Sequence, residues 1–256
     1  MSGDTSLSTP RASQYPVAFW FFRGAEVTMT AFTDEQNRVW STLYERQLPR
    51  IEKYACQEYL EGFRTLGLPA DHIPEIDFLN QAITPRTGWC TERTEVRYTD
   101  AVPWYNCFAR KTFLVTDYMR TWDELDFTPE PDMFHDIFGH LPFMVLPRYT
   151  ELQEMFAPAF LRAGPEERER IKRLAWYSTE FGLIRERGEL RLFGAGLMSS
   201  AGEIEHVMAG QVPLEPFSVE NVIRNEKSIW NFNNVLFFFD SLEAVKQELG
   251  AYFDTH

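Results

Sequence analysis

Cysteine is scarce in this 256-residue chain, and the few cysteines follow no pattern. They are Cys56, Cys90 and Cys107, an odd number with no C-x-x-C spacing among them. Such a set does not form a disulfide framework. We therefore exclude a disulfide-stabilised secreted domain and expect the protein to work in the reducing cytoplasm.

Long apolar runs and an excess of basic residues are also missing. The longest strongly apolar run covers residues 235–239, which is far too short to cross a bilayer. No basic stretch followed by an apolar one stands at the N-terminus, so no signal peptide is expected. The 25 Lys and Arg against 38 Asp and Glu give a net charge of -13, which disfavours nucleic acid and membrane partners.

Aromatic residues, by contrast, are abundant: 22 Phe, 10 Tyr and 7 Trp. They supply a core and also suit a pocket for a flat ring. The length fits one large domain or two small ones, and no repeat, linker or composition shift divides the chain. We expect residues 1–14 to form a flexible N-terminal tail and residues 15–256 to form a single domain.

Apolar residues recur at helical spacing along most of the chain. Thr33 and Gln36 form a capping-box pattern at the start of the first helix. The predicted helices cover about residues 33–48, 50–66, 76–83, 130–138, 149–162, 166–182 and 242–253, with another opening within 194–202. Residues 87–116 are expected to form loops and short strands, with strands at 111–116, 189–193 and 235–239. The pattern predicts a mainly α fold with a few short strands, in the α+β class.

Two histidines five residues apart, His135 and His140, are followed forty residues later by Glu180. Two imidazoles and one carboxylate form the facial triad that holds a non-haem ferrous ion with open positions. The same three ligands with a water molecule would also make a hydrolytic zinc site, so the residues alone leave both metals open. Asp132 and Asp136 are candidates to orient the imidazoles.

The spacing of the histidines does not suit an ordinary α-helix. Five residues rotate by about 500°, which leaves the two side chains about 140° apart. Gly139 stands just before His140, and glycine commonly ends a helix in a left-handed turn. We therefore predict that the helix stops near Phe138 and that the chain turns to bring His140 back toward His135.

Three longer segments contain these residues: TPEPDMFHDIFGHLP at 128–142, WYSTEFGL at 176–183 and FGAGLMSS at 193–200. In this order and at this spacing they resemble the aromatic amino acid hydroxylases, the tetrahydropterin-dependent phenylalanine, tyrosine and tryptophan hydroxylases. A looser match extends over residues 33–253. The resemblance implies the family's catalytic domain alone, as in the small bacterial form, with iron in a central cleft. We expect a monomer.

Several roles are implied by the resemblance alone. It implies iron on His135, His140 and Glu180. Arg120 matches the arginine that holds the substrate's carboxylate, a task that suits the bidentate guanidinium fork. Pro131 and His135 match the walls against which the substrate ring packs.

The choice of substrate depends on further matched positions. Thr128, Gly196 and Ser199 match residues that contact the backbone end of the amino acid. Trp176 matches a pocket-lining aromatic residue of the phenylalanine-hydroxylating members. Ile229 falls where tyrosine-specific relatives carry an aspartate, and an apolar residue there disfavours a phenolic ring. These positions favour phenylalanine as the substrate.

The pterin site is implied with one departure. Residues 95–104 read EVRYTDAVPW, which differs from the family's usual pterin loop. Trp104 falls where an aromatic side chain stacks on the pterin, and Asp136 matches a carboxylate near it. Ala175 replaces the tyrosine that usually precedes Trp176.

The resemblance implies hydroxylation of phenylalanine to tyrosine with O2, Fe(2+) and a tetrahydropterin. Hydroxylation of tryptophan, or of another aromatic amino acid in a specialised pathway, is the first alternative. A zinc-dependent hydrolase on His135, His140 and Glu180 and a binding protein that has lost catalysis are the others.

Overall fold

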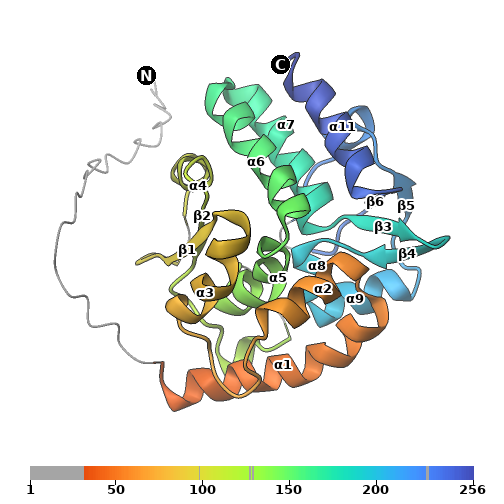
Figure 1. Cartoon of the computed structure of the whole chain (residues 1–256). Coiled ribbons are helices and arrows are strands. Elements are labelled where there is room, and N and C mark those ends of the chain that lie inside the picture. The colour runs from red at the N-terminus through yellow and green to blue at the C-terminus, as the bar shows by residue number, and fades with distance from the viewer. Residues whose placement is uncertain (1–31, 98, 127, 129, 229–230) are drawn as a thin grey trace, which may run out of the picture. The chain divides into compact units, whose positions relative to one another are not determined.

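The computed structural model describes residues 32–256, except residues 98, 127, 129 and 229–230. The predicted tail at 1–14 lies outside the described residues, so the division into a tail and one domain stays a prediction. The described residues are mostly helical, with few and short strands (Figure 1). This confirms the predicted mainly α fold.

The α-helices vary from one to six turns. In chain order they are α1 (Asp34–Tyr54), α2 (Gln57–Leu66), α3 (Ile76–Thr87), α4 (Ala101–Phe108), α5 (Leu141–Met144), α6 (Pro147–Arg162), α7 (Pro165–Ala175), α8 (Ala195–Ser199), α9 (Ala201–Met208), α10 (Val219–Ile223) and α11 (Leu242–Phe253). A 3-10 helix covers Trp122–Glu124, and π-helices cover His135–His140 and Trp176–Glu180. The two π-helices contain all three residues of the predicted metal site.

The strands form two small sheets. In the first, β1 (Cys90–Arg93) pairs in parallel with β2 (Thr112–Val115). In the second, the order is β4 (Glu189–Leu192), β3 (Leu183–Glu186), β6 (Leu236–Phe239) and β5 (Leu214–Pro216). β3 and β4 are antiparallel, whereas β6 runs parallel to both β3 and β5. The β3–β6 pairing joins the chain after Glu180 to the chain near the C-terminus (Figure 1).

An aromatic cluster packs behind the first π-helix. Phe134 and Phe138 stack with centroids 4.6 Å apart, and Trp40 of α1 meets Phe134 edge-on at 5.3 Å. Tyr59 of α2 donates its hydroxyl to the carbonyl of Phe138 at 2.6 Å. These side chains are buried, so α1 and α2 hold the π-helix firmly from one side.

Two predicted boundaries in the N-terminal half were wrong. One helix, α1, continues through Pro49 to Tyr54, and the break falls at Ala55 and Cys56. There the Cys56 N–H donates to the carbonyl of Leu192, so a distant strand decides where the helix ends. Helix α4 lies within the segment expected to hold loops and strands; its Pro103 stands in the first turn, where proline is tolerated. The predicted strand at 111–116 is confirmed as β2.

Candidate metal centre and active-site cleft

The two histidines lie on one π-helix, His135–His140, which continues directly into α5. In a π-helix each N–H bonds to the carbonyl five residues earlier, so residues five apart share a face. The predicted stop near Phe138 was therefore wrong, and Gly139 is not left-handed. A Cβ at Gly139 would lie 2.6 Å from the carbonyl oxygen of Ala195, so glycine here lets α8 approach closely.

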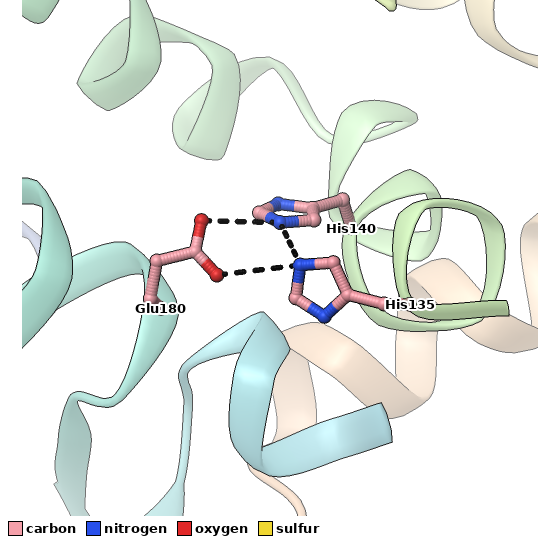
Figure 2. Close-up of side chains that lie close together, drawn as sticks. All are labelled: His135, His140 and Glu180. Atoms are coloured by element: carbon pink, nitrogen blue, oxygen red, sulfur yellow. Dashed lines mark hydrogen bonds and ion pairs between the residues drawn. The ribbon is translucent and has the colours of Figure 1, made fainter. Parts of the chain in front are cut away.

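His135, His140 and Glu180 converge on one point (Figure 2). Nε2 of His140 is 3.1 Å from Nε2 of His135 and 3.1 Å from Oε1 of Glu180, and Nε2 of His135 is 3.6 Å from Oε2 of Glu180. Ligand atoms that bind one ion at about 2.1 Å and at right angles would be about 3.0 Å apart. The three donors therefore fit one face of a metal ion's coordination sphere, as a facial triad requires.

The protonation of the triad also suits a cation. Burial, helped by the charge of His140, lowers the pKa of His135 to about 4, so this ring is neutral at pH 7. Burial alone would raise the pKa of Glu180, but His140 lowers it overall by its charge and its hydrogen bond. For His140 burial acts to lower the pKa, and Glu180 outweighs it. A metal ion bound here would displace the proton shared by His140 and Glu180.

His135 is held from two sides. Oγ of Ser199 lies 2.9 Å from Nδ1 of His135 and donates to the carbonyl of Ala195 at 3.1 Å. The hydroxyl can therefore accept Nδ1–H, which leaves Nε2 unprotonated toward Glu180. Asp132 accepts the backbone N–H of His135 at 3.0 Å, so it orients this ligand through the backbone.

Arg120 is buried and paired with a fully buried carboxylate, that of Asp132. Nε of Arg120 is 2.7 Å from Oδ2, Nη2 is 2.9 Å from Oδ1, and the backbone N–H donates to Oδ2 at 3.1 Å. Breaking such a buried pair is costly because one charge is left without a partner. The guanidinium is therefore fixed in place, with Nη1 outside the Asp132 contact.

A cleft of about 1470 Å³ opens over the triad. It is larger than the roughly 300–1,000 Å³ typical of sites for one small ligand, so it has room for two. Every predicted site residue lines it: Trp104, Arg120, Thr128, Pro131, His135, Asp136, His140, Trp176, Glu180, Gly196 and Ser199. The structure thus brings together, around one cleft, all of the residues assigned to the iron, the substrate and the pterin except Ile229, which lies outside the described residues.

The two residues assigned to the pterin come from different elements, Trp104 from α4 and Asp136 from the first π-helix, and both contact the β2 segment or the residue after it. Trp104 of α4 is partly buried against Phe108 and Phe113, with ring centroids 5.0 and 5.2 Å away. Asp136 is buried, and its Oδ2 accepts the N–H of Thr116 at 2.8 Å. Burial raises the pKa of Asp136 to about 7. The cleft therefore has an aromatic face and a buried carboxyl group on the same side.

A comparison with known protein families decides between the chemistries that this donor set allows. The model of the biopterin-dependent aromatic amino acid hydroxylases matches residues 3–255. The chain belongs to this family. The hydroxylase is therefore an oxidoreductase that uses a biopterin, and the zinc-hydrolase alternative is not supported.

Individual relatives agree with this membership. The phenylalanine-4-hydroxylase of Mesorhizobium japonicum is 37% identical over 221 residues, which cover 84% of this chain and 78% of that protein. That of Pseudomonas aeruginosa is 34% identical over 219 residues, covering 84% and 82%. The crystal structure of Chromobacterium violaceum phenylalanine hydroxylase with iron(III) and 7,8-dihydrobiopterin matches with a TM-score of 0.82 and 29% identity, covering 88% of this chain and 82% of that one.

Some cleft residues of the hydroxylase carried no signal in the sequence. Glu203 of α9, Lys227 and Asn233 all line the cleft, although they lie far along the chain from the histidines. The sequence around each of them looks like that of an ordinary helix or loop, so only the folded structure shows that they line the cleft. Ile229, used in the sequence to favour phenylalanine, lies outside the described residues. Within the described residues no helix has the length and apolar character needed to cross a membrane.

Proposed function

We propose that this hydroxylase converts phenylalanine to tyrosine with O2 and a tetrahydropterin at a ferrous ion. His135, His140 and Glu180 would hold the ion. The observation that carries the proposal is the convergence of these three side chains in a cleft that also contains a fixed arginine. Relatives named phenylalanine-4-hydroxylase at 34–37% identity support the choice of substrate.

Arg120 is proposed to bind the carboxylate of the amino acid. Asp132 holds the guanidinium through Nε and Nη2, so the N–H groups of Nη1 can serve a ligand without moving the side chain. A charged hydrogen bond of this kind fixes the register of the substrate in the cleft. Thr128, Gly196 and Ser199 line the same cleft, and by the family resemblance they would lie along the backbone end of the amino acid.

The two rings would occupy different walls. Pro131, His135 and Trp176 are proposed to enclose the substrate ring. Trp104 would stack on the pterin and Asp136 would lie near it, on the α4 and β2 side. Separate walls allow both rings to face the metal from fixed positions, which lowers the entropic cost of bringing the reactants together.

When bound, the ferrous ion and the tetrahydropterin activate dioxygen for attack on an aromatic ring. The tetrahydropterin would supply the two electrons that the reaction needs besides the substrate. The protein's own contribution is to bind, orient and exclude water. Ser199 keeps Nε2 of His135 free for the metal, and the aromatic cluster behind the π-helix keeps that side dry.

The test is a product analysis on protein loaded with Fe(II) without oxygen. The loaded protein is exposed to air with a tetrahydropterin and, separately, with phenylalanine, tyrosine and tryptophan. Tyrosine formed from phenylalanine, as the main product among the three, is the expected result. Hydroxytryptophan as the main product would favour the alternative substrate, and no hydroxylated product with any of them would contradict the proposal.

We further propose a cytoplasmic monomer without nucleic-acid or membrane partners. The three cysteines are unpaired, and the net charge of -13 supports the absence of such partners. Light scattering on the purified protein should give the mass of one chain. A stable dimer would overturn this point and leave the proposed reaction untouched.

A further inference from the structure

Trp176, the aromatic wall of the cleft, is held by a residue near the far end of the chain. Its indole Nε1 donates to Oδ1 of Asn233 at 2.8 Å, across a separation of 57 residues. Its ring also packs against Phe181 at 4.6 Å, and Nζ of Lys227 lies 6.0 Å from the ring. Asn233 thus supplies the one hydrogen bond that the indole can donate.

The orientation of the Asn233 amide follows from chemistry. An indole N–H can only donate, so the oxygen of the amide must face Trp176 and Nδ2 must face away. Asn233 is 3% exposed, and its buried Nδ2 has no hydrogen-bond partner among the described residues. An unpaired buried donor destabilises the folded state.

The unpaired Nδ2 of Asn233 lowers the stability of the fold, so the reason for an asparagine at this position has to be sought in the site. A leucine at 233 would remove the unpaired donor and keep nearly the same volume, so folding does not require the asparagine. Trp176 lines the cleft and could donate to water there instead. What asparagine alone provides is a fixed acceptor that sets the angle of the indole ring.

We propose that Asn233 is a positioning residue: through Trp176 it sets where the substrate ring sits relative to the metal. The proposal rests on the proposed hydroxylation and adds a residue to it. Trp176 and Glu180 belong to the same short π-helix, Trp176–Glu180. A rotation of the indole would therefore move the wall of the ring pocket relative to Glu180, four residues further along the helix, while Glu180 itself stays in place.

The test compares Asn233→Leu and Asn233→Asp, in wild-type and Trp176→Phe backgrounds. Asn221→Leu, at an exposed position of α10, is the matched control. Asp keeps an acceptor oxygen at the same place, whereas Leu does not. The readouts are the ring position of the new hydroxyl and the tyrosine formed per pterin oxidised. A role limited to folding would change neither readout.

Asn233→Leu is expected to lower tyrosine formed per pterin on the order of tenfold and to spread the hydroxyl over other ring positions. Asn233→Asp should restore most of the loss. In the Trp176→Phe background, which lacks the indole N–H, Asn233→Leu should have no further effect. The proposal would be overturned if Asn233→Leu formed as much tyrosine per pterin oxidised as wild type does. It would also be overturned if Asn233→Leu lowered this ratio equally in the wild-type and Trp176→Phe backgrounds.

Failure of the proposed reaction gives a different result. If wild-type protein forms no hydroxylated product, the proposed reaction is wrong, and thermal unfolding is then measured on wild type, Asn233→Leu, Trp176→Phe and the variant that carries both changes. If the double variant shifts the unfolding temperature by less than the sum of the two single shifts, the Trp176–Asn233 hydrogen bond is supported. If the shifts add, the two residues do not interact and the positioning role is overturned.

Discussion

Both carboxylate oxygens of Asp132 accept hydrogen bonds from Arg120, from Nε at 2.7 Å and from Nη2 at 2.9 Å. Asp132 also accepts the backbone N–H of His135. One buried side chain thus connects the proposed carboxylate site to the metal site. Asp132→Asn should lower the free energy of unfolding by about 3 kcal/mol, because the Arg120 charge is left unpaired in the interior. It should also raise the KM for phenylalanine about tenfold, with a smaller change in kcat.

The matched control is Asp126→Asn. Asp126 pairs with Arg46 at 3.2 Å, but its side chain is 97% exposed, and exposed pairs contribute little. Chemical denaturation and initial rates measure both variants. Equal stability losses in the two proteins would contradict the account of the Arg120–Asp132 pair.

Gly139→Ala tests the close packing of the π-helix on α8. The added Cβ would stand 2.6 Å from the carbonyl oxygen of Ala195, so one backbone must move. We expect a loss of about 2 kcal/mol in the free energy of unfolding, typical of overpacking, together with weaker iron binding. Gly164→Ala is the control, since nothing lies within 4 Å of its Cβ. If both alanine variants unfold alike, the packing argument fails.

Glu203 gives a prediction for pH. Burial raises its pKa from 4.5 to about 7, and its Oε2 has no hydrogen-bond partner among the described residues. Between these values the unfolded chain loses its proton first, so this group reduces stability as the pH rises from about 4.5 to about 7. Glu203→Gln stays neutral and should stabilise the protein at pH 8, by on the order of 2 kcal/mol, but hardly at pH 4.

Thermal unfolding between pH 4 and pH 8 measures the effect, with exposed Glu215→Gln as the control. A constant difference between Glu203→Gln and wild type across this range would show that Glu203 does not titrate there. The control should follow wild type at every pH.

Trp104 tests the proposed pterin wall. Its ring is braced by Phe108 and Phe113, so a ligand ring can stack on it without moving the side chain. Trp104→Ala should weaken binding of 7,8-dihydrobiopterin by roughly tenfold, about 1.4 kcal/mol, whereas Trp104→Phe should keep most of it. Calorimetry measures both, with half-exposed Trp122→Ala as the control. If Trp104→Ala binds 7,8-dihydrobiopterin as tightly as wild type does, the pterin does not stack on Trp104 and must bind at another wall of the cleft.

The metal triad could be predicted from the sequence because its chemistry is local to two short motifs. His135, His140 and Glu180 were identified from residue type and spacing, and the structure brings their ligand atoms together. The route between the histidines could not be predicted. An apolar pattern does not distinguish an α-helix from a π-helix, and the reason for Gly139 lies in Ala195, on another helix.

The other features that could not be predicted from the sequence depend on contacts between distant segments. The end of α1 at Tyr54 depends on the carbonyl of Leu192, and the angle of Trp176 depends on Asn233. Neither pairing leaves a periodic or motif signal in one sequence. Ser199 was assigned to the substrate, and its contact with His135 became visible only in the fold.

The central claim is that His135, His140 and Glu180 hold the iron on which hydroxylation depends. The most direct measurement is bound iron and tyrosine formation on the same samples of wild type, Glu180→Gln and the exposed control His72→Gln, after anaerobic loading with Fe(II) and desalting. Wild type and the control should retain iron and form tyrosine, whereas Glu180→Gln should lose both. Equal iron content and equal tyrosine formation in Glu180→Gln would contradict the account.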